Sequence, residues 1–478
     1  MVFASPIFLF AFLPLALALY FATPNRARNF TLLCLSLIFY TWGEHEWVVV
    51  MLASTAFNWL GAMGVERLGS DRRRQQWLLG GLVATNLGAL AVFKYSAFAL
   101  DNLNPLLTAL GARQVQLAPL HLPLGISFFT FHAISYVVDV YRGESRALKN
   151  PLDTALYIAL FPQLIAGPII RYHYIEAQLR KRSPSLADLA YGVQRFVLGL
   201  AKKVLIANVV GRCADGVFQL APEHLAFGVA WVGVLAYALQ IYFDFSGYSD
   251  MAIGLGSMFG FRFPENFNHP YVSQSITEFW RRWHISLSSW FRDYLYIPLG
   301  GNRVSTARTY LNLITVFLLC GLWHGASFNF IIWGALHGAF LVLERTRYGR
   351  LLEAAPRALR HALTLIVVSV GWVFFREADL SSALTFLHAL IGASGASRAG
   401  YPVLLYFTPA VQLAALLGCL FSTPLAATVQ RHFESGKPGP LRVWLWRALS
   451  ICVLLALFTL SSAYLASQSY NPFIYFRF

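Results

Sequence analysis

Two histidines lie in an apolar stretch of this chain, where an imidazole could carry acid–base chemistry. They are His324 and His337, within GLWHGASFNFIIWGALHG. An imidazole titrates near neutral pH and can therefore take a proton from a hydroxyl as a general base. His324 precedes Gly325, and a helix break at this glycine would let a substrate approach the ring. The alternative for both residues is a structural histidine that is hydrogen bonded to a backbone carbonyl.

The stretch that holds these histidines is too long to be one membrane helix. As a single helix, residues 310–343 would extend about 50 Å, whereas the hydrocarbon core of a bilayer is about 30 Å thick. We therefore predict a break at residues 325–327. An unbroken helix would also hold the two rings about 140° apart, so the break is required if they are to share a cavity.

A third histidine, His284, lies in a polar and aromatic segment at 271–300. Apolar residues recur there at helical spacing on one broad face, which predicts an amphipathic helix at the membrane interface or beside a hydrated cavity. On that helix His284 shares a face with Trp280 and Arg281. The positive charges of Arg281 and Arg282 favour a neutral imidazole, which suits a base. The alternative is a polar residue on a solvated face.

Four charged side chains also lie in apolar surroundings, where ionisable groups are costly and need partners. Asp244 and Asp250 occur in QIYFDFSGYSD, and Lys202 and Lys203 occur in VLGLAKKVLIANVV. Each aspartate is expected either to orient a histidine or to pair with an arginine from 281–292. The lysines either extend to the cytoplasmic interface or bind an anionic donor such as a phosphate.

Composition indicates that these residues lie in a membrane protein. Hydrophobic residues make up 57% of the 478 residues and charged residues only 12%, against about 25% charged residues in an average soluble protein. The net charge of +15 comes from short basic stretches between apolar runs, as in cytoplasmic loops, so nucleic-acid binding is not expected. The sequence has no motif for a serine nucleophile, a P-loop or a zinc protease, so we expect no bound metal.

The apolar runs predict an all-α polytopic membrane protein with about eleven to thirteen spans. Basic residues follow the first, third and fifth runs, which places the N-terminus outside and the basic loops in the cytoplasm. Segment 151–171 contains Pro162, Gly167 and Pro168, which would interrupt a helix in mid-membrane, so the segment is either re-entrant or a kinked span. The runs lie at 5–22, 30–42, 46–64, 77–98, 119–140, 190–210, 226–243, 246–260, 309–323, 328–344, 359–376, 403–421 and 444–466.

Longer motifs around the same residues resemble a known family. They include LPLGISFFTFHAISYVVDVYRG at 122–143, FPQLIAGPIIR at 161–171, QIYFDFSGYSDMAIGLG at 240–256 and FRFPENFNHPYVSQSITEFWRRWHISLSSWFRDYLYIPLGGNR at 261–303, with GLWHGASFNFIIWGALHG and the ending NPFIYFRF. Over nearly its whole length, the chain resembles the membrane-bound O-acyltransferase (MBOAT) superfamily. Within that superfamily it resembles the integral-membrane component of the bacterial alginate O-acetyltransferases.

The resemblance implies a fold and a catalytic pair. The MBOAT fold is a ring of transmembrane helices, with re-entrant and amphipathic helices, around a central tunnel that brings donor and acceptor from opposite sides. The chain would form one domain over 1–478, with a catalytic core at about 120–345 and peripheral helices at 1–118 and 346–478. His324 matches the catalytic histidine of the family, and His284 matches a second functional histidine.

The other candidate residues take roles around this pair. His284 would hold the donor carbonyl, polarise the oxyanion or relay a proton. An acyl-histidine at His324 is the alternative to general-base catalysis. The residues expected along the donor and acceptor tunnel are Trp323, Asp244, Arg281, Arg282 and His337, and those expected to bind donor phosphates are Lys202 and Lys203.

The resemblance also implies an activity, the transfer of acetyl groups to hydroxyls. A cytoplasmic thioester, expected to be acetyl-CoA, would supply the acetyl group without a bound cofactor, in a multi-pass protein of the bacterial inner membrane. A periplasmic or membrane-anchored partner with a serine-hydrolase-like fold would then acetylate a secreted polysaccharide, either alginate or a related polymer such as cellulose. Two other hypotheses stay open: a lipid or glycan transporter without acyl chemistry, and an acyltransferase that modifies a lipid or a protein.

Overall fold

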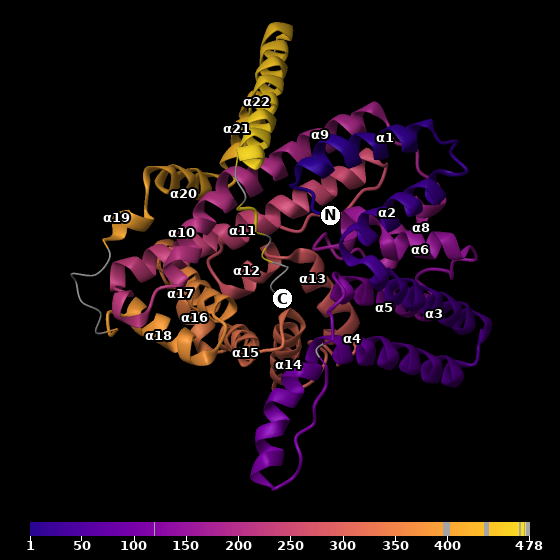
Figure 1. Ribbon diagram of the computed structural model, residues 1–478, viewed down its shortest axis with the longest axis horizontal. Coiled ribbons are helices and arrows are strands. Elements are labelled where there is room, and N and C mark those ends of the chain that lie inside the picture. The colour runs from indigo at the N-terminus through magenta and orange to yellow at the C-terminus, as the bar shows by residue number, and fades with distance from the viewer. Residues whose placement is uncertain (119, 395–401, 435–438, 468–469, 473, 475–478) are drawn as a thin grey trace. The chain divides into compact units, whose positions relative to one another are not determined.

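The computed structural model describes the chain except for residues 119, 395–401, 435–438, 468–469, 473 and 475–478 (Figure 1). Every regular element in this described part is a helix. The predicted all-α class is therefore confirmed.

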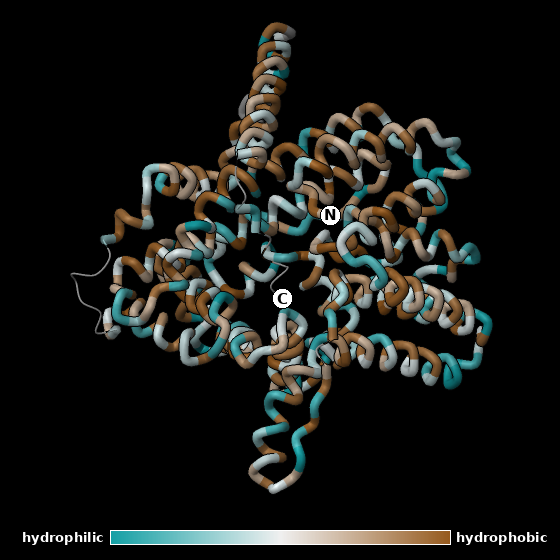
Figure 2. Tube along the Cα trace, in the orientation of Figure 1, coloured by the Kyte–Doolittle hydropathy of each residue, from teal (hydrophilic) through white to brown (hydrophobic). Residues whose placement is uncertain are grey.

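Several helices are long and apolar enough to cross a bilayer. Six stretches within the described ranges meet this condition, and four shorter apolar helices of 10–17 residues accompany them. Hydrophobic residues, brown in Figure 2, recur along the C-terminal helix α22 (Pro440–Ser467). The chain is therefore a multi-pass membrane protein, and the total of about eleven to thirteen spans stays a prediction. The six stretches are Arg28–Arg67, Arg72–Ala109, Phe227–Met258, Thr306–His324, Arg357–Arg376 and Leu441–Ser467.

The helices group into two compact units, which are described separately. Unit 1 consists of Met1–Val193 and Ala252–Pro264, and unit 2 consists of Gln194–Met251 and Glu265–Phe478. Two long helices, α9 (Leu186–Ala201) and α11 (Phe227–Met258), contribute residues to both units. That residues 1–478 act as one domain stays a prediction.

Unit 1 holds the N-terminal helices of the chain. Besides its part of α9 and α11, its elements are η1 (Phe8–Phe12), α1 (Leu13–Ala22), α2 (Arg28–Glu44), η2 (His45–Trp47), α3 (Val48–Arg67), α4 (Arg72–Ala109), α5 (Ile126–Arg142), α6 (Pro151–Ala159), α7 (Phe161–Leu164) and α8 (Tyr172–Arg180).

The break expected within 151–171 is present. Helix α6 ends at Ala159, α7 is a single turn, and the backbone then continues without helix to residue 171. Gly167 is required in this stretch, because a Cβ atom there would lie 2.6 Å from the Cα of Gln163. The hydroxyl of Tyr157 satisfies part of the buried backbone by donating to the carbonyl of Ile170 at 2.9 Å. The interruption is confirmed, whereas a re-entrant path through the membrane stays a prediction.

Unit 2 holds the remaining helices. Besides its part of α9 and α11, its elements are η3 (Lys202–Ala207), α10 (Asn208–Phe218), η4 (Pro222–His224), η5 (Pro270–Val272), α12 (Ile276–Arg282), α13 (Ile285–Phe291), η6 (Arg292–Tyr296), α14 (Thr306–His324), α15 (Phe328–Leu343), α16 (Arg347–Ala354), α17 (Arg357–Arg376), α18 (Leu380–Leu390), α19 (Val403–Tyr406), α20 (Pro409–Phe421), α21 (Leu425–Glu434) and α22.

The prediction of two spans at 226–243 and 246–260 is wrong, because α11 is one continuous helix. Gly247 lies within it, where the missing side chain serves helix packing. A Cβ atom at Gly247 would lie 2.7 Å from the carbonyl oxygen of Gly199 on α9. The glycine therefore lets two helix backbones approach each other closely and does not end the helix.

The break predicted at 325–327 is confirmed. Helix α14 ends at His324, and Gly325 is extended, with φ of −170°. Ser327 then caps α15 by accepting a hydrogen bond from the backbone N–H of Asn329 at 3.2 Å. The break converts one overlong apolar stretch into a helical hairpin.

Helices α14 and α15 pack side by side in this hairpin (Figure 1). Glycines form the contact: a Cβ atom at Gly321 would collide with the carbonyl oxygen of Phe330, and one at Gly334 would collide with that of Phe317. The sequence spacing of small residues therefore fixes how closely the two helices approach.

The single amphipathic helix expected over 271–300 is broken in two. Helix α12 ends at Arg282, and α13 begins at Ile285. Between them His284 takes the left-handed conformation, with φ of 44°, which is uncommon for a residue with a Cβ atom. The prediction that His284 shares a helix face with Trp280 and Arg281 is therefore wrong, since helical phase does not continue through the break.

Candidate active site

His324 ends α14 and lies within an enclosure of aromatic rings. Only 6% of its surface is exposed. Its ring centroid lies 4.9 Å from that of Trp323, 5.1 Å from that of Trp333 and 5.0 Å from that of Phe375. All three rings meet the imidazole edge to face. Rings from α14, α15 and α17 thus hold the imidazole in one orientation at the helix break.

A small cavity lies beside His324. Its volume is about 10 Å³, roughly the room that one water molecule needs. Among the described residues of its wall, His324 has the only titratable side chain, so the imidazole faces an almost wholly apolar space. Hydrogen bonds to the imidazole would be strong in such surroundings. The other wall residues are Ile241, Phe245, Trp283, Trp333, Trp372, Phe375 and Ile474.

His284 lies in the break between α12 and α13, where Asn266 fixes its tautomer. The ring is 1% exposed, and Nδ1 lies 3.1 Å from Asn266 Oδ1. The same Asn266 atom accepts from the backbone N–H of Ser286 at 3.1 Å. Because a backbone N–H can only donate, this Asn266 atom is the carbonyl oxygen, and Nδ1 of His284 must carry a proton.

The other ring nitrogen of His284 is therefore an acceptor when the ring is neutral. Nε2 is buried and has no hydrogen-bond partner among the residues that the structure describes. A neutral His284 can take a proton at Nε2 but cannot donate one there. This geometry supports proton relay more directly than hydrogen-bond donation to an oxyanion.

Trp323 lies next to both histidines. Its ring centroid is 4.9 Å from that of His324 and 6.4 Å from that of His284. Phe245 makes a second connection, because its ring lies 4.6 Å from that of His284 and also lines the cavity beside His324. The structure thus brings together three residues that the sequence marked as site residues.

His337 lies behind this group and outside the cavity wall. It is fully buried, and its ring centroid is 5.0 Å from that of Trp333 and 5.2 Å from that of Trp280. Neither ring nitrogen has a hydrogen-bond partner within the described ranges. The helix break places both His324 and His337 against Trp333, but of the two only His324 lines the cavity. A role for His337 in a tunnel stays a prediction.

Asp244 pairs with Lys203, and among the residues that the structure describes it pairs with neither a histidine nor an arginine from 281–292. The side chains are 2% and 4% exposed, with Oδ1 2.5 Å from Nζ. The ion pair also binds the C-terminal segment: Asp244 Oδ2 accepts from the N–H of Ile474 at 3.0 Å, and Lys203 donates to the carbonyl of Pro472. Because Ile474 lines the cavity beside His324, this buried pair positions one wall of the site.

Lys202 makes a separate ion pair with Asp250. Its Nζ lies 2.6 Å from Asp250 Oδ2, and Arg195 Nη2 lies 2.7 Å from Asp250 Oδ1. Both lysines that are predicted to bind donor phosphates thus form an ion pair with an aspartate. Their role as phosphate ligands stays a prediction.

Arg281 and Arg282 lie on α12 outside the wall of the His324 cavity. Arg281 is exposed. Arg282 pairs with Glu278 at 2.9 Å and donates to the carbonyl of Asn268 at 3.0 Å. These contacts hold the turn before His284, and a tunnel role for either arginine stays a prediction.

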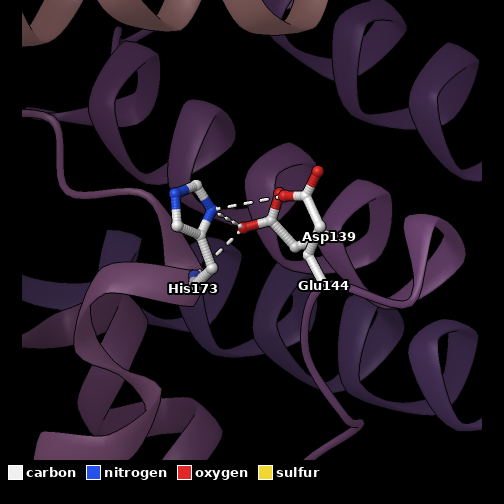
Figure 3. A group of neighbouring side chains, drawn as sticks. All are labelled: Asp139, Glu144 and His173. Carbon is white, nitrogen blue, oxygen red and sulfur yellow. Dashed lines mark hydrogen bonds and ion pairs between the residues drawn. The ribbon is translucent and has the colours of Figure 1, made fainter.

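Unit 1 contains a cluster of Asp139, Glu144 and His173 that the sequence did not predict. The fully buried Asp139 contacts His173 twice through its Oδ2 atom (Figure 3). This oxygen accepts a hydrogen bond from the backbone N–H of His173 at 3.0 Å and lies 2.9 Å from its Nδ1. Glu144 Oε2 lies 3.6 Å from the same Nδ1. The three residues could hold a metal ion by their types and spacing. The double contact fits equally well a structural role in which the Asp139 carboxylate holds the His173 ring in place. His173 lies far from the other two residues in the sequence, so only their proximity in space identifies the three as a cluster.

The arrangement in unit 2 fits acyl transfer. His324, a neighbouring histidine with a fixed tautomer and an apolar cavity lie together there, and a buried imidazole is a group that could accept a proton from a hydroxyl. Comparison with known proteins agrees: residues 124–375 match the membrane-bound O-acyltransferase family. The chain belongs to this family and is an O-acyltransferase. The hypothesis of a transporter without acyl chemistry is set aside by this finding.

Individual relatives indicate which branch of the O-acyltransferase family the chain resembles. The chain is 44% identical to the probable alginate O-acetylase of Azotobacter vinelandii and 42% identical to that of Pseudomonas aeruginosa, and each alignment covers 100% of both chains. It is 38% identical to the peptidoglycan O-acetyltransferase of Helicobacter pylori, over 83% of this chain and 81% of the relative. The predicted resemblance to the alginate branch is confirmed.

Proposed function

We propose that this protein takes an acetyl group from a cytoplasmic thioester donor and passes it across the inner membrane for O-acetylation of a secreted polysaccharide. The observation that carries the proposal is the position of His324. It is a buried imidazole at a helix break, and it is the only titratable group among the described residues that line an apolar cavity. Full-length similarity to probable alginate O-acetylases supports acetyl as the transferred group.

The chemical step follows from the properties of imidazole. His324 accepts the proton of the acceptor hydroxyl while the hydroxyl oxygen attacks the carbonyl carbon of the thioester. The tetrahedral intermediate then collapses with cleavage of the carbon–sulfur bond, and the imidazolium returns the proton to the leaving thiolate. The products are an O-acetyl ester and a free thiol, and His324 regains its neutral form. Acylation of His324 itself is the alternative route.

The side chains around His324 assist the proposed proton transfer by positioning its imidazole and by accepting a proton. Trp323 and Trp333 hold the imidazole edge to face. We assign His284 a proton relay, because Asn266 leaves its Nε2 as an acceptor. The mostly apolar cavity has room for about one water molecule, which limits the water that could compete with the hydroxyl and hydrolyse the thioester.

The donor and the topology are part of the proposal. Acetyl-CoA is the expected donor, since it is a soluble cytoplasmic thioester and needs no bound cofactor. The basic residues after the first, third and fifth apolar runs support cytoplasmic loops there and, with them, a periplasmic N-terminus. A periplasmic or membrane-anchored partner with a serine-hydrolase-like fold would receive the acetyl group and esterify the polymer.

Alginate is the first candidate polymer because the relatives that align over their full length carry that name. Peptidoglycan is the second, since a named peptidoglycan O-acetyltransferase aligns over most of its length. Acetylation of cellulose, a lipid or a protein stays an alternative hypothesis.

The test is genetic complementation with chemical analysis of the polymers. Wild type and His324→Ala are produced at equal membrane levels in a strain without its own copy, and acetyl ester is measured on secreted polysaccharide and on peptidoglycan. We expect wild type to restore ester on the polysaccharide and the variant to restore none. Acetyl ester on peptidoglycan alone would show that peptidoglycan, and not the secreted polysaccharide, is the acceptor. Restoration of ester by His324→Ala would show that His324 has no role in the chemistry.

A further inference from the structure

Unit 2 contains a second, much larger cavity that the acyl-transfer chemistry does not use. Its volume is about 740 Å³, within the range of about 300–1,000 Å³ typical of ligand sites. The wall comes from α10, α11, α17 and α20, and most of it is aliphatic, as with Leu235, Leu239, Val368 and Val411. This lining suits hydrocarbon.

One end of the cavity is polar and positively charged. Arg357, the first residue of α17, lines it together with His361 and Gln274. Arg357 is exposed and makes no ion pair with any residue that the structure describes. Nδ1 of His361 lies 3.1 Å from the carbonyl of Ser273, which fixes this ring at the same end. Ser422 and Thr423, directly after α20, also line the cavity, and their hydroxyls donate to the carbonyls of Gly418 and Leu420.

The length of the cavity matches one leaflet of a bilayer. Its wall residues on α17 run from Arg357 to Ser369, which is about 18 Å at the helical rise of 1.5 Å per residue. Half of a hydrocarbon core of about 30 Å is roughly 15 Å. A charged group held at Arg357 would therefore lie at the membrane surface, with its chain reaching toward the midplane.

Positive charge between α15 and α17 and in the first turn of α17 indicates which leaflet this end of the cavity faces. Arg345, Arg347 and Arg350 lie between α15 and α17, and Arg360 follows Arg357 within one turn. Such a concentration of arginine between two membrane helices indicates the cytoplasmic side. Anionic lipids of that leaflet are attracted to clustered basic residues at the surface.

We propose that this cavity, the α11–α17–α20 groove, is a binding site for one anionic phospholipid of the cytoplasmic leaflet. The phosphate binds the Arg357 guanidinium, which offers paired N–H donors suited to phosphate. The acyl chains occupy the aliphatic wall between α11, α17 and α20. The charge at one end selects the headgroup, and the apolar length accepts the chains without distinguishing them.

The lipid would lie close to the catalytic enclosure without entering it. Tyr271 lines the groove, and Trp372 lines the cavity of His324. The indole N–H of Trp372 donates to the Tyr271 hydroxyl at 3.2 Å, and that hydroxyl donates to the carbonyl of Ala238 at 2.6 Å. This hydrogen-bonded pair separates the two spaces, so a bound lipid would buttress one wall of the active site.

Native mass spectrometry of the purified full chain tests the proposal. The protein is equilibrated in mild detergent with equal amounts of phosphatidylglycerol and phosphatidylcholine. We expect wild type to retain one phosphatidylglycerol. Arg357→Ala should weaken that retention about tenfold, the size expected for one charge-assisted contact. Ala415→Trp, which fills the groove from α20, should abolish retention of both lipids.

The matched control is Arg350→Ala, which removes an exposed arginine that does not line the groove. It should retain phosphatidylglycerol as wild type does. Equal retention of the two lipids by wild type would overturn the proposal, as would retention of neither. Equal loss in the Arg350 and Arg357 variants would reduce the effect to general surface charge and would also overturn it. Because Arg357 is exposed, its variant remains interpretable even if Ala415→Trp fails to fold.

Discussion

His324 and Trp333 meet across the break between α14 and α15, with ring centroids 5.1 Å apart and an interplanar angle of 83°. Trp333 also meets His337, at 5.0 Å. One indole thus packs against two histidines, but only one of the two lines the cavity. The catalytic role proposed for His324 therefore rests on the hairpin geometry that places this ring.

The close packing of the hairpin depends on Gly321. We expect Gly321→Ala to lower the free energy of unfolding by about 1–3 kcal/mol, because the added methyl would collide with the carbonyl of Phe330. The measurement is thermal unfolding in detergent. Gly88→Ala is the matched control: Gly88 lies in α4, where an added methyl would meet no described atom within 4 Å, and alanine there should be neutral or slightly stabilising. Equal effects of the two substitutions would contradict the packing argument.

The fully buried pair of Lys203 and Asp244 should contribute more to stability than the partly buried pair of Lys202 and Asp250. Lys203→Ala leaves a buried carboxylate without its partner and should cost about 3–5 kcal/mol of unfolding free energy. Lys202→Ala should cost less, because Lys202 is 30% exposed and Asp250 keeps its contact with Arg195 at 2.7 Å. Chemical unfolding of the two variants compares them directly. A larger loss for Lys202→Ala would refute this ranking.

Asn266 is predicted to be a positioning residue. Asn266→Ala removes the acceptor that fixes the His284 tautomer and should lower the rate of acetyl transfer by about ten- to a hundredfold, the range for removing a group that orients a metal-binding histidine. The readout is kcat and KM on protein that remains folded by gel filtration. Asn268→Ala is the control, because Asn268 is exposed and its contact with Arg282 uses the backbone carbonyl. Unchanged kcat in Asn266→Ala would exclude the positioning role.

The hairpin break could be predicted from the sequence because its causes are local. The apolar stretch exceeded the membrane thickness, and Gly325 marked the place where a helix could end. The break at His284 could not be predicted, because apolar spacing continues through it without glycine or proline. Its cause is tertiary: Asn266, eighteen positions earlier along the chain, accepts hydrogen bonds from His284 and Ser286.

The partners of the buried charged residues could not be predicted from the sequence either. The sequence indicated that Asp244 needs a partner, yet it offered no reason to choose Lys203, which lies on the preceding π-helical turn η3. The contact of this pair with Pro472 and Ile474 joins residues more than two hundred positions apart. Such pairing depends on how helices cross, which local patterns do not encode.

The central claim is that His324 is the catalytic base. Its most direct test is the rate of single-turnover acetyl transfer by purified wild type and His324→Ala, measured as loss of the radiolabelled acetyl group from acetyl-CoA with release of the free thiol. We expect the variant to remain folded and to lose about 10²- to 10⁴-fold in rate, the usual contribution of general acid–base catalysis. Added imidazole should restore part of the rate, because the substitution leaves room beside the existing cavity. Transfer by His324→Ala at the wild-type rate would contradict the account and would make His284 the leading base.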